Sequence, residues 1–509
     1  MPINLYRAEQ TRELDRYAIE ELGVSSLLLM ERAGMACFRQ IEARWPNAKH
    51  ITIFCGHGNN GGDGYVIAGL AKLAGVDVTV LQLGALEQMR GDAAFCQQRA
   101  NRLGVTIDTI LNSDDLSAQR AHLDNSDIVV DALLGTGISG APRGLYKQAI
   151  DAINQCAANV LAVDTPSGLC VDTGYAEGVV VKAQLTLTFI ACKQGLLTGS
   201  AANYTGTLLF DDLGVPQDVY LHQAPSSLRL DLVTLLKCLP FRPAIAHKGD
   251  CGHVLVIGGA EGMGGAAVMA ATAAARVGAG LVSIASPNEN ITLQAASQPE
   301  LMCPSAKYEV DLRGLILRAN ALVIGPGLGE SEWSILALTL ALESGKPCVV
   351  DADAQNLFSE SSSMQAHSSC VLTPHPKEAS RLLHCSTGEV QKDRFKAIGV
   401  MTKTFGATVV LKGSGTLISD GQQISLLSAG GPAMASGGMG DVLSGVIGGL
   451  MAQGCAALYA AQLGASLHAG AADRLAEASG VRGVLATDLI PSIRQLMQST
   501  SLANNGAYE

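Results

Sequence analysis

Residues Ile51 to Gly75, ITIFCGHGNNGGDGYVIAGLAKLAG, combine an apolar strand pattern, a glycine-rich turn and a helix pattern. Eight of the nine positions from Gly56 to Gly64 are Gly, Asn or Asp. Glycines allow positive φ and let backbone N–H groups approach a ligand, and the positive end of the following helix attracts an anion. We expect a nucleotide pocket here, because a plain strand-to-helix turn, the alternative, needs only about two such residues.

Strand and helix patterns alternate around this stretch. Apolar residues have helical spacing over residues 8–45, with a break near Gly23. Alternation predicts βαβ units and a parallel sheet, whose ligands lie at the carboxyl ends of the strands. The expected strands are 51–54, 76–81, 128–131, 160–164, 185–190 and 207–210, and the expected helices are 65–74, 87–103 and 145–155.

Two loops at strand ends carry further polar groups. Asp131 begins DALLGTGISGAPRG, whose glycines and Arg143 predict a second phosphate cradle, with a long surface loop as the alternative. VDTPSG places Asp164 and Ser167 at the next strand end. Asn60, Asp131 and Ser167 offer an amide, a carboxylate and a hydroxyl oxygen, which suit a hard cation. A hydrogen-bonded cluster without metal accounts for the same residues.

The second half repeats the order of strand, glycine turn and helix. GHVLVIGGAEGMGGAA predicts a strand over 254–257, a turn over 258–265 and a helix from Ala266. Further strands are expected over 281–285, 322–324, 348–351, 371–372 and 408–411. The last four precede the loops GPGLG, DADAQN, TPHPKE and KGSGT.

A glycine turn near the end of the chain carries an acidic residue. SAGGPAMASGGMGDVLSG places three glycines immediately before Asp441, which opens a helix. Backbone N–H groups there form an anion hole, and Asp441 stands where a proton moves during phosphoryl transfer. As the alternative, Asp441 is only a helix N-cap. The segment from Lys412 to Thr416 predicts a second anion cradle at the same sheet edge.

Length and composition restrict the class of protein. A chain of 509 residues is too long for one ordinary core, and we expect domains at 1–224 and 225–509, separated in a proline-containing region. Hydrophobic residues make up 48% and charged residues 16%, which fits α/β domains. The net charge of -11 argues against nucleic acid or an anionic membrane as the main partner.

Cysteine usage and the N-terminus indicate a cytoplasmic protein. The thirteen cysteines are scattered without a C-x-x-C pair, which predicts reduced thiols and no zinc site. The charged N-terminus lacks the apolar core of a signal peptide. The apolar run from Ala266 to Ala285 consists largely of Ala and Gly and contains Arg276, so it predicts a packed helix and strand, not a membrane span.

Both halves resemble known families. CGHGNNGGDGYV resembles the signature of the NAD(P)HX epimerase domain, which forms the first half of the bifunctional NAD(P)HX repair enzymes, and the match covers about residues 8–213. The second match runs from about 247 to 473 and resembles the ADP-dependent NAD(P)HX dehydratase domain. Together, the two resemblances imply an N-terminal Rossmann-like three-layer sandwich and a C-terminal ribokinase-like α/β domain. The motifs of the second match are HKG, GHVLVIGG, GMGGAA, GPGLG, DADA, TPHPKE, KGSGT and GGMGDVLSG.

For the first domain, the resemblance implies a site for the hydrated dinucleotide with bound K⁺. The residues matching the potassium ligands are Asn60, Asp131 and Ser167. Asp164 is expected either to carry the proton or only to orient the substrate. The substrate-binding residues implied are Asn60, Gly61, Gly62, Asp63, Gly64, Gly135, Thr136, Gly137, Ile138, Ser139, Gly140, Ala141 and Asp164.

For the second domain, the resemblance implies ADP as phosphoryl donor, with Mg²⁺ neutralising developing charge. The C6 hydroxyl is phosphorylated, phosphate leaves, and Asp441 moves the proton. Gly431 and Met439 depart from the family, where Asn and Thr are usual, and this predicts altered nucleotide binding. The substrate side is Ala266, Gly327, His375 and Asp441, and the nucleotide side is Lys412, Gly413, Ser414, Gly415, Thr416 and Gly440. Without the resemblance, the favoured interpretation of His375 is a histidine between two prolines in an ordered loop.

Three functions are therefore weighed. The first is a homo-oligomeric repair enzyme that interconverts R- and S-hydrated NADH or NADPH and dehydrates the S form with ADP. The second is a ribokinase-type small-molecule kinase fused to a nucleotide-binding domain, which would release a phosphorylated product. The third is a non-catalytic dinucleotide-binding regulator, which would tolerate loss of the Asp441 carboxylate.

Overall fold

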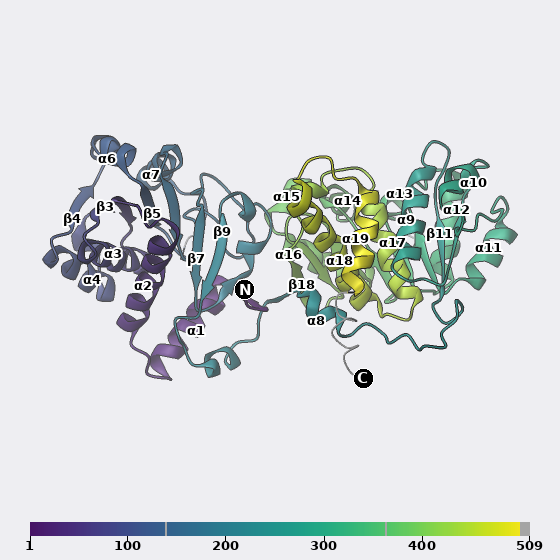
Figure 1. Cartoon of the computed structure of the whole chain (residues 1–509), viewed down its shortest axis with the longest axis horizontal. Coiled ribbons are helices and arrows are strands. Elements are labelled where there is room, and N and C mark those ends of the chain that lie inside the picture. The colour runs from purple at the N-terminus through teal and green to yellow at the C-terminus, as the bar shows by residue number, and fades with distance from the viewer. Residues whose placement is uncertain (138–139, 362–363, 499–509) are drawn as a thin grey trace. The chain divides into compact units, whose positions relative to one another are not determined.

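The computed structural model describes residues 1–137, 140–361 and 364–498 and divides the chain into two compact units, Met1–Ser227 and Leu228–Glu509 (Figure 1). Ile138 and Ser139, expected to bind substrate, lie outside the described residues. No disulfide joins any of the thirteen cysteines in the described part of the chain. Within the described ranges, no helix has the length and apolarity needed to cross a bilayer.

The first unit is built on a parallel sheet of seven strands in the order β4-β3-β2-β5-β6-β7-β9. Chain order reverses between the neighbours β2 and β5, and such a reversal opens a crevice at the carboxyl ends of the strands. The strands are β2 (His50–Cys55), β3 (Asp77–Leu83), β4 (Thr106–Ile110), β5 (Ile128–Ala132), β6 (Asn159–Val163), β7 (Leu185–Phe189) and β9 (Thr207–Asp211). The short β1 (Asn4–Tyr6) pairs with β8 (Cys192–Lys193). The expected strands are confirmed, whereas β4 was not predicted.

Helices cover both faces of this sheet (Figure 1). Alternate side chains of a strand point to opposite faces, so Ile51 and Ile53 enter one apolar core and Phe54 enters another. The first core includes residues of α2 (Ser26–Arg44), α3 (Asn59–Leu73) and α4 (Gly91–Arg102), and the second includes residues of α5 (Ser113–Ala118), α6 (Arg120–Asn125) and α7 (Gly144–Gln155). With α1 (Ala8–Glu20) added, the unit is the expected three-layer sandwich.

The glycine-rich turn differs from expectation. Helix α3 begins at Asn59, inside the expected turn, and Gly56 to Gly64 includes no residue with positive φ. A Cβ on Gly61 would lie 2.0 Å from the carbonyl oxygen of Gly56, and one on Gly62 would lie 2.5 Å from the sulfur of Met30. The prediction of positive φ is therefore wrong, because these glycines serve close packing of the helix start against its neighbours.

The second unit contains parallel strands in the order β12-β11-β13-β14-β15-β16, followed by antiparallel β17 and β18 and by β10 parallel to β18. The parallel strands are confirmed, but the antiparallel pair was not predicted. The bounds are β10 (Ser227–Arg229), β11 (His253–Ile257), β12 (Leu281–Ala285), β13 (Ala321–Ile324), β14 (Cys348–Val350), β15 (Cys370–Leu372), β16 (Thr408–Leu411), β17 (Thr416–Ser419) and β18 (Ile424–Leu427).

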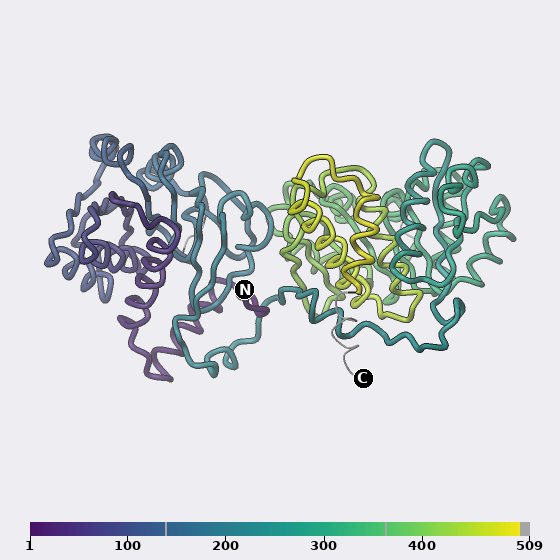
Figure 2. Tube along the Cα trace, in the orientation of Figure 1, coloured from purple at the N-terminus to yellow at the C-terminus, as the bar shows by residue number. Residues whose placement is uncertain are grey.

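Two helices distant in sequence lie side by side in this unit, teal α9 (Gly264–Arg276) and yellow-green α17 (Met439–Ala452) (Figure 2). A Cβ on Gly445 would lie 2.0 Å from the carbonyl oxygen of Ala270, so small residues set their approach. The other helices are α8 (Leu232–Leu236), α10 (Ile291–Gln294), α11 (Glu309–Arg318), α12 (Glu332–Glu343), α13 (Ala352–Glu360), α14 (Pro376–Leu382), α15 (Thr387–Lys392), α16 (Arg394–Phe405), α18 (Ala457–Ser479) and α19 (Ala486–Gln498).

Candidate active sites

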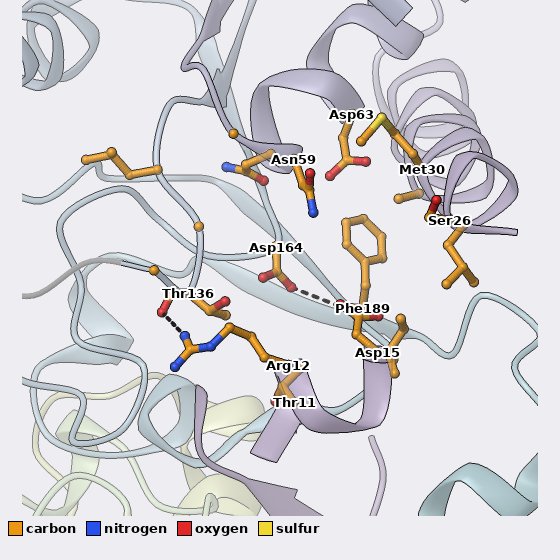
Figure 3. A pocket seen from close by; sticks show the side chains of 18 of the residues that line it. Thr11, Arg12, Asp15, Ser26, Met30, Asn59, Asp63, Thr136, Asp164 and Phe189 are labelled. Atoms are coloured by element: carbon orange, nitrogen blue, oxygen red, sulfur yellow. Dashed lines mark hydrogen bonds between the residues drawn. The ribbon is translucent and has the colours of Figure 1, made fainter. Parts of the chain in front are cut away.

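A pocket of ≈ 550 Å³ opens at the reversal of strand order in the first unit (Figure 3). The loops after β2, β5 and β6 line it, together with residues of α1 and α2. Of the predicted site residues, the lining includes Asn60, Asp63, Gly135, Thr136, Gly137 and Asp164. The structure thus brings these six residues together in one pocket, whereas its lining does not include the predicted Gly61, Gly62, Gly64, Gly140 and Ala141.

Asp131 and Ser167 form a buried pair beneath this pocket. The Ser167 hydroxyl donates to Oδ1 of Asp131 at 2.6 Å, and the Ser167 amide donates to Oδ2 at 2.8 Å. Burial raises the pKa of Asp131 to about 6, although the bonds from Ser167 lower it. No Lys or Arg pairs with Asp131 in the described part of the chain, so a cation would find an uncompensated carboxylate here.

Asn60 completes the predicted oxygen set. Its side-chain Oδ1 and Nδ2 are buried and have no hydrogen-bond partner among the described residues. The loop after β5 connects the three residues, since Leu134 donates its amide to the Ser167 hydroxyl at 3.0 Å and Gly135 packs against Asn60. An unpartnered buried amide oxygen is costly unless a ligand binds it, so these residues fit an oxygen-coordinated cation.

Asp164 adopts a left-handed backbone conformation, with φ 64°, directly after β6. Its Oδ1 accepts hydrogen bonds from the Thr188 hydroxyl and the Phe189 amide, each at 3.1 Å, and from the ammonium of Lys193. Asp is one of the few residues that tolerate this conformation, so the strand end can turn its carboxylate into the pocket.

Two more carboxyl groups share the pocket (Figure 3). Burial raises the pKa of Asp63 well above its ordinary value, and the neighbouring Asp164 and Asp15 raise it further. Burial likewise raises the pKa of Asp15 to about 6. Burial therefore favours the protonated form of Asp63, while Asp164 is paired with Lys193.

Sequence reasoning missed Asp15, Lys193 and Arg12 in this pocket. Arg12 lies on α1 and donates to the carbonyl of Thr136 at 3.1 Å (Figure 3). Arg12 and Asp15 lie on α1 and Lys193 lies on β8, and none of the three belongs to a glycine-rich motif, so no local pattern marked them.

In the second unit, Asp351 lies at the centre of a charged network. Its carboxylate accepts from the Thr373 hydroxyl at 2.7 Å, the Lys412 ammonium at 3.1 Å and the Ser444 hydroxyl at 2.5 Å. Burial opposes ionisation, but Lys412 and these hydroxyls lower the pKa of Asp351 overall. Lys412 also lies 3.7 Å from Glu378, so the loops after β14, β15 and β16 meet at one sheet edge.

Asp441 stands in the first turn of α17, beside this network. The helix N-cap is Gly438, with φ 89°, so the alternative of Asp441 as N-cap is wrong. Burial raises the pKa of Asp441 to about 7, with a further contribution from Asp351 that Lys412 partly offsets. A carboxyl group with a pKa near neutrality can both take and return a proton.

The four predicted substrate residues of this unit lie around the same edge. A Cβ on Gly327 would lie 3.3 Å from Cβ of Ala266, which places these two together. His375 accepts the amides of Lys377 and Glu378 through Nδ1 and thereby caps α14. The ordered-loop interpretation of His375 thus has a physical basis, although its ring also reaches Glu378 at 3.4 Å.

The KGSGT loop rests on an arginine that sequence reasoning missed. Arg394 is fully buried and donates to the carbonyls of Leu411, Lys412 and Gly415 at 3.1 to 3.4 Å. Gly413, with φ 131°, packs so closely on the guanidinium that a Cβ there would lie 2.9 Å from a terminal nitrogen. Arg394 lies 18 residues before Lys412, in α16, where no motif marked it.

The two departures from the family pattern have different surroundings. Met439 is buried in the apolar core formed with α9 and α18, so its side chain contributes packing. Gly431 is exposed in the preceding loop, where the neighbouring Gly430 amide donates to Asp473 at 2.9 Å. Neither observation measures nucleotide affinity, and the effect of these departures stays a prediction.

Two family models match the chain. One, described as NAD(P)H-hydrate dehydratase, matches residues 254–495. The other, described as YjeF-related protein N-terminus, matches residues 26–195. Each match falls within one compact unit.

Curated relatives match over nearly their whole length. The bifunctional NAD(P)H-hydrate repair enzyme of Coxiella burnetii is 48% identical over 494 residues, covering 97% of this chain and 99% of that protein. The Escherichia coli enzyme of the same description is 40% identical, with coverage of 98% and 94%.

Among solved structures, a hypothetical protein from Streptococcus mutans is 32% identical, with a TM-score of 0.50, and covers 54% of this chain and 99% of its own. An ADP/ATP-dependent NAD(P)H-hydrate dehydratase from Bacillus subtilis, co-crystallised with ATP and Mg²⁺, is 27% identical, with a TM-score of 0.48 and coverage of 53% and 97%.

Proposed function

The chain belongs to the bifunctional NAD(P)H-hydrate repair enzymes, with an epimerase domain followed by a dehydratase domain, and we propose which of its residues carry each reaction. The observation that carries the proposal is the position of Asp441 beside Lys412 and Asp351. A carboxyl group with a pKa of about 7 lies there near a cation, in the first turn of a helix whose N–H groups suit an anion.

In the first site, Asp164 is the proposed proton carrier. Inversion at C6 requires the hydroxyl to leave, assisted by the ring nitrogen, and water to return on the other face. Asp63, whose protonated form is favoured by burial, is a group able to supply the proton that the departing hydroxyl needs. The carboxylate of Asp164 can accept the proton that the returning water loses.

In the second site, Asp441 is the proposed base for phosphorylation of C6. It takes the hydroxyl proton as the terminal phosphoryl group of ADP transfers to the C6 oxygen, leaving AMP. Phosphate is a far better leaving group than hydroxide, so it can depart from C6 while C5 loses a proton to water, which restores the nicotinamide double bond. The ammonium of Lys412 and the N–H groups at the start of α17 suit the charge of the transferring group.

Two cations belong to the proposal. The residues Asn60, Asp131 and Ser167 would hold K⁺, which would supply positive charge beside the loop after β5. For Mg²⁺, the described residues contain no cluster of three or more His, Cys, Asp or Glu side chains suited to a metal. We therefore assign no protein site to Mg²⁺ and derive no step from it.

Recovery of absorbance in the reduced-nicotinamide band tests the proposal. The purified full chain, with K⁺, Mg²⁺ and ADP, is given a mixture of R- and S-hydrated NADH. Rapid recovery of the whole mixture is expected. Recovery of the S fraction alone would contradict an active epimerase site. A stable phosphorylated product would support a kinase, and no turnover with ADP or ATP would support a binding regulator.

Replacing Asp131 with alanine tests the cation site. Three donors from Leu133 and Ser167 would lose their buried acceptor, so the free energy of unfolding of the first unit should fall by about 3 kcal/mol. Epimerase activity should fall about 100-fold, with dehydration of the S form retained. Thermal unfolding in KCl and NaCl of equal ionic strength adds a readout, since K⁺ should stabilise only the parent protein.

The exposed Asp218 provides the matched control, because Asp218→Ala removes a carboxylate of the same unit without touching the pocket. Equal KCl stabilisation in the Asp131→Ala protein and in this control would rule out Asp131 as a potassium ligand.

A further inference from the structure

Three hydrogen bonds hold one oxygen of the Asp164 carboxylate. Oδ1 accepts from Thr188, Phe189 and Lys193, and no described protein group donates to Oδ2. The Asp164 side chain is 16% exposed, and the residue lines the pocket. One carboxylate oxygen is therefore occupied by the protein, and the other remains available to a ligand.

Lys193 has no capacity to bind a ligand itself. Its ammonium donates to Asp164, to the Thr188 hydroxyl at 3.1 Å and to the Phe189 carbonyl at 3.1 Å, which uses its three hydrogens. The side chain is only 1% exposed. A buried ammonium with every hydrogen committed fixes the position of its partner.

The backbone returns Lys193 to this place by a sharp turn after β7. Ile190 has φ 61°, and the Ala191 amide donates to the Phe189 carbonyl at 2.6 Å. The Tyr220 hydroxyl donates to the Ile190 carbonyl at 2.6 Å, and β8 then pairs Lys193 with Tyr6 of β1. Hydrogen bonds thus fix the turn before Lys193, and strand pairing fixes Lys193 itself.

We propose that Lys193 is a positioning residue of the epimerase site, which holds Asp164 by Oδ1 so that Oδ2 meets the substrate at C6. This inference rests on the proposed role of Asp164. The lysine also distinguishes Asp164 from Asp63, since Asp164 forms an ion pair with Lys193 and Asp63 forms none with the described residues. A reaction that both gives and takes a proton needs such a difference.

The test uses R-hydrated NADH with the full chain and no ADP, so that the dehydratase is idle. Conversion to the S form is followed by chromatography, and kcat and KM are measured separately. Lys193→Met should lower kcat about 100-fold, since a carboxylate displaced by about 1 Å loses that much, with KM changed by about 3-fold or less. Lys193→Arg should recover part of kcat because it restores the cation.

Chemical rescue separates positioning from folding. Because Lys193 lines the pocket, methylammonium should raise the kcat of Lys193→Ala and leave the parent protein unchanged. Lys182→Met, which removes an exposed lysine from the same unit, should retain parental kcat and KM. Thr188→Val, which removes one donor to Oδ1 and keeps Lys193, should lower kcat less than Lys193→Met does.

The outcomes distinguish the inference from the proposal beneath it. Full epimerase activity in Asp164→Asn would overturn the role of Asp164 and, with it, that of Lys193. An inactive Asp164→Asn together with parental kcat in Lys193→Met would overturn only the inference about Lys193. Loss of kcat in Lys193→Ala that neither methylammonium nor the arginine variant restores would also overturn it.

Discussion

Dehydration of S-hydrated NADH should fall about 1000-fold when Asp441 is replaced by asparagine, with little change in epimerase activity. The substitution keeps the shape of the side chain and removes its ability to take a proton, which typically costs 10²- to 10⁴-fold. Glu343→Gln, an exposed carboxyl group on α12, is the matched control and should be fully active. A variant with parental dehydratase activity would contradict the assignment of Asp441 as the base.

The pH dependence of dehydration follows from the same residue. Burial and the charge of Asp351 raise the pKa of Asp441 to about 7, so its basic form accumulates only as the pH rises through neutrality. The kcat/KM for S-hydrated NADH should therefore increase with pH up to about 7 and then level. An acid limb near pH 4, the range of an ordinary aspartate, would contradict this assignment.

The free energy of unfolding should depend on pH in the opposite direction. The ordinary pKa of Asp is 3.8 and the folded value of Asp441 is about 7, so the folded state binds more protons between these values and the Asp441 contribution to stability declines as pH rises through this window. An asparagine side chain at this position does not titrate. The Asp441→Asn protein should therefore unfold at a higher temperature than the parent at pH 8, and at nearly the same temperature at pH 4, by calorimetry.

Replacing Arg394 with methionine should have the largest effect on the KGSGT loop, which we propose binds ADP. The carbonyls of Leu411, Lys412 and Gly415 would lose a buried donor, which costs about 3 kcal/mol or more of folding free energy. Because these carbonyls hold the KGSGT loop, its amides would also lose their alignment toward the nucleotide. The KM for ADP should rise about 10-fold or more, which corresponds to about 1.4 kcal/mol.

Lys396→Met provides the control for Arg394, since it removes an exposed cation from the same helix by the same substitution. Thermal unfolding and the KM for ADP should both match the parent in this variant. An Arg394→Met protein with lowered stability and an unchanged KM for ADP would show that the arginine supports the fold without positioning the loop. Epimerase activity reports whether the first unit is intact.

Local sequence patterns identified most of the strands and the loops at their carboxyl ends. Strands buried on both faces are continuous apolar runs, as in Val254 to Ile257, and such runs are visible without structural information. Loops that approach a ligand are rich in glycine, so GNNGGDG and KGSGT marked the strand ends correctly. The antiparallel strands β17 and β18 were missed, although strands of the same length such as β16 were found.

The glycine motif shows how a correct location can carry a wrong physical reason. Gly61 and Gly62 were expected to supply positive φ, but they lie in α3. Glycine is needed there because a side chain would collide with Gly56 or Met30. Conformational freedom and close approach both require glycine, and the sequence does not distinguish them.

By itself, the sequence determined the two α/β units, the strand ends that carry glycine-rich loops, and the identity of Asp164 and Asp441 as candidate acids and bases. Only the tertiary structure decided what surrounds them. Lys193 reaches Asp164 from 29 residues away, and Arg394 reaches the KGSGT loop from a different helix. Such contacts depend on how strands and helices pack, whereas motifs record only what neighbouring residues share, so the groups that position a catalytic carboxylate leave no local pattern.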